Sequence, residues 1–347
     1  MFLLTLRDLA HRWVRFVVVS VLGALVFALL FVMTGLVEQF NLEPADTVDA
    51  IGADGWLLPD GLSGPFTATA TMSASTLDEL QAAESSAVVA ARTTIGGAVE
   101  EQEGVLLGVV PGQLGVPVVD EGRAIAASGE VMVDSSTGAD VGDAVQLAGE
   151  SFSVVGITTD TKLFAGLPLV TVSHDDSQRL AFGAGDVVSG AVVNGAVEAV
   201  PEGTQIVSAD DVVAATLEPL EGAISSIDLV RALLWILAAI VIGAVVYLSA
   251  LERQRDFAVL KAVGTPNRAL LGSLAIQAVV VALVAVAVGA VIQLFLAPRF
   301  PLRVRLPASA YWQLPVLAIV VALVAGAVGM RKVASADPAA AFAGAGA

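Results

Sequence analysis

Four long apolar stretches, separated by polar segments, dominate the hydropathy pattern of this chain of 347 residues. They cover residues 16–37, 232–251, 269–297 and 306–330 and contain no Asp, Glu, Lys, Arg or His. Each approaches or exceeds the roughly 20 residues that cross a bilayer as an α-helix. The first is too long for a signal-peptide core of about 7–15 residues, and no A-x-A-like cleavage site follows it. We therefore expect four membrane-spanning helices, the first being a permanent anchor.

This pattern predicts a membrane protein with four transmembrane α-helices and an α+β extracytoplasmic domain inserted between helices 1 and 2. A longer first span with a polar flank is the alternative to an interfacial helix at the N-terminus. The predicted segments are an amphipathic N-terminal cytoplasmic or interfacial helix (1–15), span one (16–37), the extracytoplasmic α+β domain with a stalk (38–228), span two (229–251), a cytoplasmic coupling helix and turn (252–268), span three (269–297), a short extracytoplasmic loop (298–313), span four (314–330) and a cytoplasmic tail (331–347).

The segment 38–228 alternates between short apolar runs and turn residues. Ser208 and Asp211 form a capping signal that predicts a helix up to Pro219, and Thr76 with Glu79 predicts another that reaches Arg92. Short Val-rich runs bounded by Gly, Asp and Ser predict strands. These runs are 104–110, 130–133, 144–147, 151–157 and 167–172.

Composition agrees with a membrane protein. Hydrophobic residues make up 56% of the chain and charged residues 15%, whereas a soluble domain carries roughly 25% charged residues. The net charge of −17 disfavours nucleic-acid binding. The chain has no cysteine, which excludes disulfides, thiol catalysis and Cys-ligated zinc.

Charge is distributed very unevenly along the chain. Residues 38–228 hold 30 of the 34 acidic residues but only 4 of the 17 basic ones. Basic residues in short flanks mark the cytoplasmic side of a membrane protein. Nine of them occupy the three segments that four spans place on one side, against three in 298–313. We therefore expect a multi-pass plasma (inner) membrane protein with both termini cytoplasmic and the acidic domain outside.

The segment after span two is the most informative of the short segments. Phe257, Leu260 and Val263 form an apolar stripe, and Gly264 is placed to end a short helix. Thr265 and Pro266 are suited to cap and open the next helix. One interpretation is a plain connecting loop. The other is an amphipathic helix that docks on a cytoplasmic partner.

Residues 252–265, Glu-Arg-Gln-Arg-Asp-Phe-Ala-Val-Leu-Lys-Ala-Val-Gly-Thr, resemble a motif of the FtsX-like permease family of ABC transporters, the MacB, LolC and DevC type. That motif runs roughly E-R-x-x-E-φ-G-φ-L-[KR]-A-φ-G, with φ apolar. Asp256 replaces the usual Glu and Ala258 the usual Gly. Arg331, Asp337-Pro338 and Phe342 resemble the family's C-terminal ending. Residues 129–157 are similar to part of the MacB periplasmic domain.

The resemblance implies a permease subunit that couples ATP hydrolysis in a separate cytoplasmic ATPase to movement of the extracytoplasmic domain, called mechanotransmission, for export or extraction of a lipid, peptide or drug-like substrate. It implies two ATPase copies and a second permease subunit, identical or a close paralogue. An FtsX-type regulator that activates a cell-wall hydrolase or senses envelope stress is the alternative. The implied coupling residues are Glu252, Arg253, Arg255, Asp256, Phe257, Leu260, Lys261, Val263 and Gly264.

Catalytic and cofactor signals are weak. The chain lacks G-x-x-x-x-G-K-[ST], so we expect no cofactor here, with ATP and Mg in the partner ATPase, and no enzymatic activity of this subunit. His174, Asp175 and Asp176 resemble a metal or catalytic cluster, but one His without a nucleophile–base pattern favours a solvated loop. Besides membrane lipids, an extracytoplasmic lipoprotein, peptide or hydrolase is an expected partner.

Small and polar residues within the spans predict how helices pack. Ser20, Ala24 and Ala28 recur every fourth position, which lets helices approach closely and suggests a possible dimer seam; chance is the alternative in an Ala-rich chain. Similar steps occur at Ala239–Gly243, Ala285–Gly289 and Ala318–Ala322–Gly326. Gln277 and Gln293 are the main polar residues of the spans, and we expect them to make packing hydrogen bonds.

Overall fold

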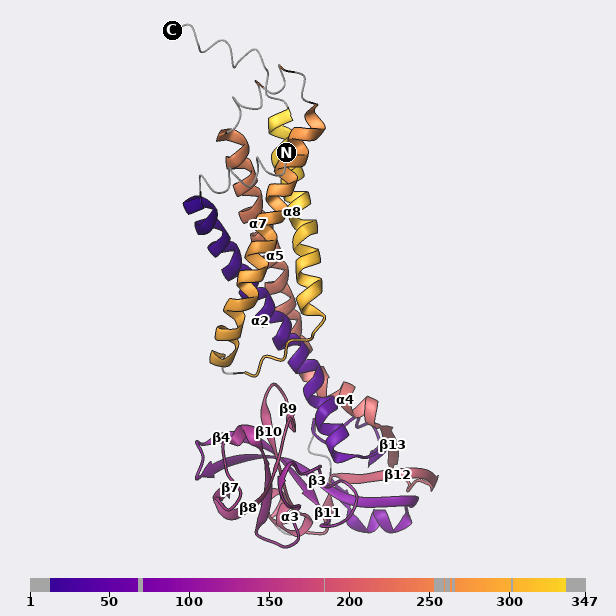
Figure 1. Cartoon of the computed structure of the whole chain (residues 1–347). Coiled ribbons are helices and arrows are strands. Elements are labelled where there is room, and N and C mark those ends of the chain that lie inside the picture. Colours follow the sequence, from indigo (N-terminus) through magenta and orange to yellow (C-terminus); the bar gives the residue numbers. More distant parts are fainter. Residues whose placement is uncertain are drawn as a thin grey trace. The chain divides into compact units, whose positions relative to one another are not determined.

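The computed structural model describes residues 13–67, 71–183, 185–252, 259, 263, 266–300 and 302–334 (Figure 1). The chain forms two compact units. We call them the helical domain, Met1–Glu38 with Ser225–Ala347, and the sheet domain, Gln39–Ile224. The predicted N-terminal helix lies almost entirely outside the described residues, as does most of the predicted tail.

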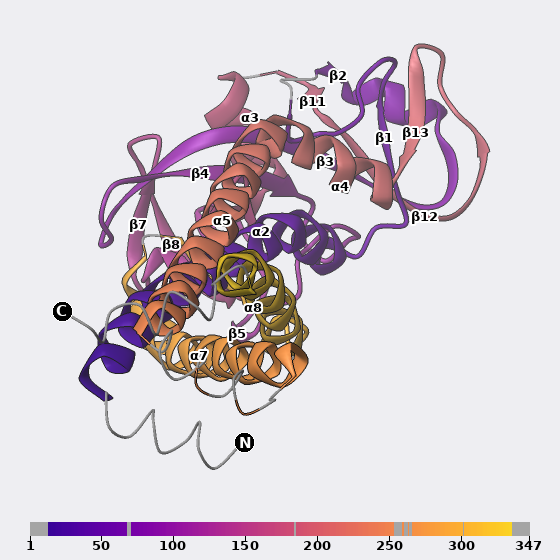
Figure 2. The same cartoon turned by 90° about the horizontal axis from the view of Figure 1, so that it is seen from above.

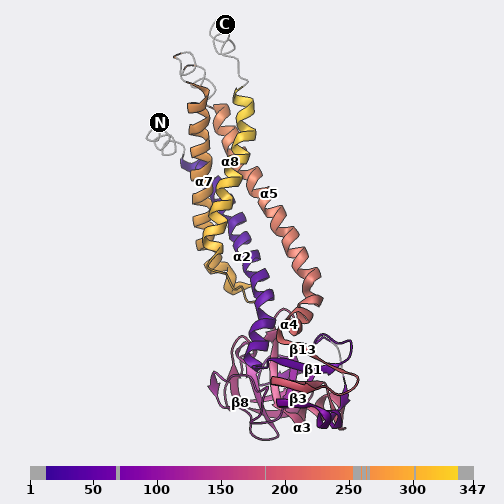
Figure 3. The same ribbon diagram turned by 90° about the vertical axis from the view of Figure 1, so that its right-hand side faces the viewer.

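Apolar helices build the helical domain: α2 (Trp13–Ile51), α5 (Glu221–Glu252), α7 (Asn267–Leu296) and α8 (Ala310–Ala334). Among the described residues, three helical segments are long and apolar enough to cross a membrane, namely Ser20–Ile51, Ala209–Glu252 and Gly272–Arg299. Residues Ala310–Ala325 of α8 are also apolar but form a shorter stretch. Figures 1 and 3 show α7 and α8 side by side. The 3-10 turn η4 (Ala297–Arg299) follows α7 directly.

Residues spaced by four form the core of the helical domain. Such a spacing places side chains on one face of a helix. The α5 face is Leu234, Ala238, Ile242, Val246 and Ala250; the α8 face is Ala310, Leu314, Ala318 and Ala322; and α7 adds Leu274, Ala278, Ala282, Ala285 and Val286. Phe27, Leu30 and Phe31 of α2 complete this core.

The outward faces of these helices are apolar as well. Large side chains of α5 such as Leu233, Ile236 and Ile240 are more than half exposed. A helix that is hydrophobic all round belongs in a large core or in a membrane. The two predicted packing hydrogen bonds are confirmed: Gln277 Nε2 donates to Ser249 Oγ at 3.0 Å, and Gln293 Nε2 donates to Tyr311 Oη at 3.1 Å.

The sheet domain is α+β, as predicted. Its main sheet has the order β13-β1-β12-β3-β4-β10-β6-β8-β5, with β7 beside β3 and β8 and β9 beside β10. Strands β13, β1 and β12 lie together at one end of this sheet (Figure 2). The strands are β1 (Gly55–Pro59), β2 (Met72–Ser73), β3 (Gln81–Gly97), β4 (Gln102–Val109), β5 (Glu121–Gly122), β6 (Glu130–Asp134), β7 (Ala144–Leu147), β8 (Glu150–Thr158), β9 (Lys162–Leu163), β10 (Leu167–Ser173), β11 (Val187–Val188), β12 (Gly190–Ala199) and β13 (Thr204–Ser208).

Both faces of the central strands are buried. In β4, Val105, Leu107 and Val109 belong to one apolar core, while Leu106 belongs to the other. This division follows from the alternation of side chains along a strand. Two strand pairs, β4–β10 and β6–β8, are parallel. Parallel pairing buries strands on both faces, which explains the continuous apolar runs in the sequence.

The five predicted strands and the helix capped by Ser208 are confirmed. Helix α4 (Ala209–Leu217) begins after Ser208, whose side chain accepts from Asp211 N; the turn η3 (Glu218–Leu220) then leads into α5. The remaining short elements are η1 (Ala74–Glu79), η2 (Ser135–Thr137) and α3 (His174–Phe182).

Two sequence predictions in this domain are wrong. The helix expected from Thr76 to Arg92 is the short turn η1 followed by strand β3. Pairing of β3 with β12, β4 and β7, together with β-branched residues such as Val88 and Ile95, outweighs the local capping signal. The loop expected at 174–176 is the start of α3, where Ser173 is the N-cap and Asp176 is fully buried.

Candidate coupling site

The predicted ATPase-docking segment is described only at its edges. Glu252 is the last residue of α5 and is exposed. Val263 is 81% exposed, and its N–H donates to the carbonyl of Val259 at 3.1 Å, which is the i to i−4 bond of a helix. Helix α7 starts one residue after Pro266, which is its N-cap and not part of its first turn. The other implied residues, Arg253, Arg255, Asp256, Phe257, Leu260, Lys261 and Gly264, lie outside the described residues.

The small residues of the suggested dimer seam pack within the chain. Ala24 and Ala28 are at most 1% exposed, and Ser20 is half-buried. A Cβ on Gly289 of α7 would lie 2.8 Å from the carbonyl oxygen of Ala24 and 3.0 Å from the amide nitrogen of Ala28. These residues therefore let α2 and α7 approach each other. This contact argues against a dimer seam at Ala24 and Ala28, since neither offers surface to a second subunit.

A buried polar stripe marks the C-terminal part of α2, beyond its apolar stretch. Gln39, Glu43 and Thr47 are spaced by four, so they share one face of the helix, and each is at most 3% exposed. Gln39 Nε2 donates to Glu43 Oε1 at 3.0 Å. Polar groups are buried at little cost only when they are hydrogen-bonded, so the partners of this stripe decide its role.

The stripe holds the turn between β9 and β10. Thr47 Oγ1 donates to the carbonyl of Lys162 at 2.7 Å, and Glu43 Oε2 accepts from the N–H of Gly166 at 3.0 Å. Between these two anchors, Phe164, Ala165 and Gly166 all have left-handed backbones, with φ of 53°, 65° and 103°. Two of the three are not glycine, and such conformations persist only where surrounding contacts enforce them. Helix α2 is thus hydrogen-bonded to both ends of this turn.

A buried ion pair continues from this turn into the sheet. Lys162 Nζ lies 3.7 Å from Asp134 Oδ1, and the two side chains are 8% and 0% exposed. Asp134, the last residue of β6, also accepts from Thr161 N at 2.9 Å and from Ser136 N at 2.9 Å. A buried carboxylate needs such partners, because an unpaired one costs several kcal/mol. The set Glu43, Thr47, Lys162 and Asp134, which we call the α2 anchor, links α2 to the sheet.

The sequence contained part of the signal for this anchor. Helix α2 continues to Ile51, past the predicted end of span one at residue 37. The apolar residues Val48 and Ile51 and the four-residue spacing of the polar stripe are typical of an amphipathic helix. Pro44 conceals this pattern, since proline is rare inside helices. The partners of the stripe are more than one hundred residues away and could not be read from spacing.

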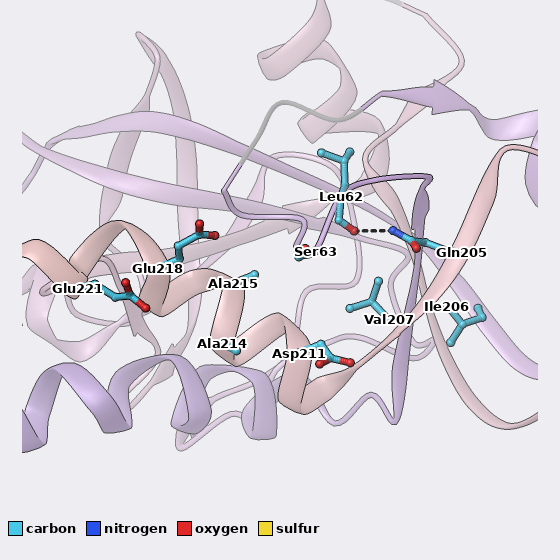
Figure 4. A pocket seen from close by; sticks show the side chains of 10 residues that line it. All are labelled: Leu62, Ser63, Gln205, Ile206, Val207, Asp211, Ala214, Ala215, Glu218 and Glu221. Atoms are coloured by element: carbon cyan, nitrogen blue, oxygen red, sulfur yellow. Dashed lines mark hydrogen bonds between the residues drawn. The ribbon is translucent and has the colours of Figure 1, made fainter.

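A separate cavity of about 530 Å³ lies beside α4 and β13. Three carboxylates line it, from Asp211, Glu218 and Glu221, and Figure 4 shows the last two as neighbours along the helical segment. Gln205 Nε2 donates across it to the carbonyl of Leu62 at 3.0 Å. No group of three or more His, Cys, Asp or Glu within the described ranges is arranged to hold a metal ion.

Comparisons with known proteins find relatives that match nearly the whole chain. A family model described as FtsX-like permease C-terminal matches residues 229–338. The chain is 39% identical over 345 residues to Rv2563, an uncharacterised ABC transporter permease of Mycobacterium tuberculosis, with 98% of both chains covered. It is 37% identical over 343 residues to Rv0072, another uncharacterised ABC transporter permease of that organism, again with 98% of both covered.

Two solved structures show weak likeness. The extracellular domain of the noncanonic ABC-type transporter YknZ from Gram-positive bacteria has 15% identity and a TM-score of 0.31, covering 44% of this chain and 99% of that chain. The periplasmic region of MacB from Actinobacillus actinomycetemcomitans has 12% identity and a TM-score of 0.34, covering 49% and 96%. Because the full-length relatives exceed one-third identity across almost their whole length, the chain belongs to the FtsX-like family of ABC transporter permeases.

Proposed function

We propose that this permease subunit relays conformational change from a separate cytoplasmic ATPase to the sheet domain, which lies outside the plasma membrane. The substrate is a lipid, a peptide or a drug-like molecule that the sheet domain engages. ATP and Mg belong to two ATPase subunits, which seat on the segment after α5 in two permease subunits. The four spans anchor the protein, and both termini are cytoplasmic.

The continuity of α2 carries this proposal. The helix runs from Trp13 to Ile51, and its 39 residues make it about 58 Å long, almost twice the hydrocarbon thickness of a bilayer. It contributes residues to both domains, since the boundary falls between Glu38 and Gln39. An unbroken helix resists bending and rotation more than a loop does. Movement at one end therefore reaches the other end.

A relay also requires that α2 be bound firmly to the sheet domain, and the α2 anchor provides this binding. Thr47 and Glu43 bind the β9–β10 turn directly, and Lys162 connects that turn to Asp134 in the sheet. The anchor is buried, so water does not compete for these bonds. If these contacts were solvated, side-chain motion would absorb part of the displacement of α2 before it reached the sheet.

The apolar character of the spans also supports force transmission rather than a hydrophilic pore. Ion and proton pathways usually contain ionisable residues inside the membrane, and the four apolar stretches 16–37, 232–251, 269–297 and 306–330 have none. In the described part of the helical core, the buried polar side chains of Gln277 and Gln293 are used in hydrogen bonds between helices.

A helix break in α2 tests the relay. Asn41 is exposed on α2, three residues after the domain boundary at Glu38. Asn41→Pro adds a second proline three residues before Pro44 and removes a further helix hydrogen bond without changing the core, and Asn41→Ala is the matched control. The readout is hydrogen exchange of the β9–β10 turn, with and without ATP, in the complex with its ATPase. We expect an ATP-dependent change in the wild type and in Asn41→Ala, and its loss in Asn41→Pro at unchanged basal ATPase activity. An unchanged response in Asn41→Pro refutes the relay.

Docking of the ATPase is tested on the predicted apolar stripe. Leu260→Asp places a charge in that stripe, whereas Gln254→Asp places the same charge at a polar position of the same segment. We expect Leu260→Asp alone to abolish co-purification with the ATPase. If both variants still form an active complex, the stripe is not the docking surface. Capture of a cell-wall hydrolase in place of a transported molecule by the intact complex would favour the regulatory alternative.

A further inference from the structure

One arginine of the sheet domain differs from the other basic residues there. Arg123 pairs with Glu130 at 2.9 Å, Arg179 with Asp176 at 2.8 Å, and Lys162 with Asp134 at 3.7 Å. Among the described residues, no carboxylate lies within 4 Å of the Arg92 guanidinium. Its group lies over the ring of Phe164 instead, with 4.1 Å between the guanidinium carbon and the ring centroid. In a segment with 30 acidic residues, an arginine without a direct ion pair is unexpected.

Arg92 and Phe164 line a cavity of about 250 Å³. The rest of its wall is apolar or weakly polar: Pro65, Phe66, Thr67, Ala90, Ala91, Val105 and Pro219. Small-molecule sites are typically concave and mainly apolar, with few polar groups that fix the orientation of the ligand. Most residues of its wall are apolar by type, and the one charged residue among them is positive.

The aromatic side of the cavity is fixed by strained backbone. Phe164 has φ of 53° and belongs to the left-handed turn that the α2 anchor grips. Strain of this kind is typical of functional sites, where it holds a side chain in a required position. The guanidinium lies over the ring, and its N–H groups have no hydrogen-bond acceptor among the described residues, so they can donate to an anion.

We propose that this cavity binds a small organic anion, a carboxylate or phosphate carried on an apolar or aromatic body. Arg92 binds the anionic group, while Phe164, Phe66 and Val105 contact the apolar part. The source is either a free small molecule or the anionic end of a lipid. Anion binding at this site is independent of the proposed relay and can be measured without an ATPase.

One neighbouring carboxylate opposes such a ligand. Glu103 of β4 is displaced diagonally from Arg92 on the paired strand, where Arg92 is opposite Val105 and Thr94 is opposite Glu103. Its negative charge attracts the guanidinium and repels an anion at the same position. Neutralising Glu103 should therefore strengthen anion binding, and neutralising Arg92 should weaken it. If Arg92 and Glu103 only stabilised the fold, neutralising them would not change anion binding in opposite directions.

The test is calorimetric titration of the full chain in phosphatidylcholine nanodiscs. Octanoate is the anionic probe, and octylammonium has a similar body with the opposite charge. We expect octanoate to saturate one site in the wild type. Arg92→Gln should lower the affinity for octanoate about tenfold, and Glu103→Gln should raise that affinity about twofold. Glu84→Gln, an exposed acidic position on the same strand as Arg92, should change nothing. Unchanged octanoate binding in Arg92→Gln, or equal strengthening by Glu84→Gln, overturns the proposal.

Two further arms complete the experiment. Phe164→Leu keeps an apolar wall without the ring. It should weaken octanoate binding several-fold and leave octylammonium binding unchanged. Nanodiscs that contain phosphatidylglycerol identify the source: competition with octanoate indicates a lipid ligand, and no competition indicates a free molecule. Unfolding midpoints equal to that of the wild type establish that the variants are folded.

Discussion

Gly289 of α7 lies against Ala24 of α2 so closely that no side chain fits between them. A Cβ on Gly289 would be 2.8 Å from the Ala24 carbonyl oxygen and 2.9 Å from Phe27 Cβ. The obstructing oxygen is backbone, so it cannot move aside as the end of a flexible side chain would. The packing of these two helices thus requires glycine at this position, as at other close helix crossings in membranes.

We predict opposite effects of the same substitution at two glycines of α7. Gly289→Ala should destabilise the protein by about 1–3 kcal/mol, because the helices must separate to admit the methyl group. Gly272→Ala adds a methyl group in open space and should be neutral or stabilising by up to about 1 kcal/mol, since alanine favours helix. Thermal unfolding of the purified protein measures both. A lower midpoint for Gly272→Ala than for Gly289→Ala contradicts the assigned packing.

The α2 anchor predicts different losses of stability for two substitutions at Thr47. Thr47→Val keeps the shape but leaves the Lys162 carbonyl without its donor, which should cost about 1–3 kcal/mol. Thr47→Ser keeps the donor and loses one methyl group, so its cost should be about 1 kcal/mol. Denaturant unfolding gives the two values. The interpretation fails if the serine variant is the less stable one.

The buried pair Lys162–Asp134 predicts partial rescue. Lys162→Met leaves the buried Asp134 without its ionic partner, which should cost about 3 kcal/mol. Adding Asp134→Asn removes the carboxylate and should restore a substantial part of the stability, so that the double variant is more stable than Lys162→Met alone. The comparison change, Arg123→Met at the exposed pair with Glu130, should shift the unfolding midpoint little. Additive losses in the double variant contradict an ionic role.

His174 predicts a loss of stability in mild acid. Burial lowers the pKa of His174 below its usual value of about 6.5, against the opposing charges of Asp175 and Asp186, and its Nδ1 is buried without a described partner. The unfolded chain binds the proton more readily, so stability is full above pH 6.5. It falls as the pH drops below that value, until the folded imidazole is itself protonated.

The measurement for His174 is the unfolding midpoint between pH 7.5 and pH 5. We expect the wild type to decline over this range by more than His174→Gln, which has no group that titrates there. Parallel curves for the two proteins would show that His174 does not contribute.

Much of the secondary structure followed from local pattern. The strands at 130–133, 144–147 and 167–172 were predicted from Val-rich runs between turn residues, and the N-cap at Ser208 was predicted from its spacing to Asp211. The segment from Thr76 to Arg92 was mispredicted, because β3 gains hydrogen bonds from three partner strands that no local window contains. Cross-strand pairing is a property of the tertiary structure, so helix propensity could not predict it.

The sequence by itself determined the membrane class, the apolar helices and the inserted acidic α+β segment, because hydropathy, charge and helix caps act over a few residues. Only the tertiary structure decided which small residues face each other, that α2 continues past Pro44, and which cation of the described sheet domain has no direct ion pair. Gly289 meets Ala24, and Thr47 meets Lys162, across separations of more than one hundred residues. Contacts of that range depend on how whole elements pack, and spacing along the chain does not contain them.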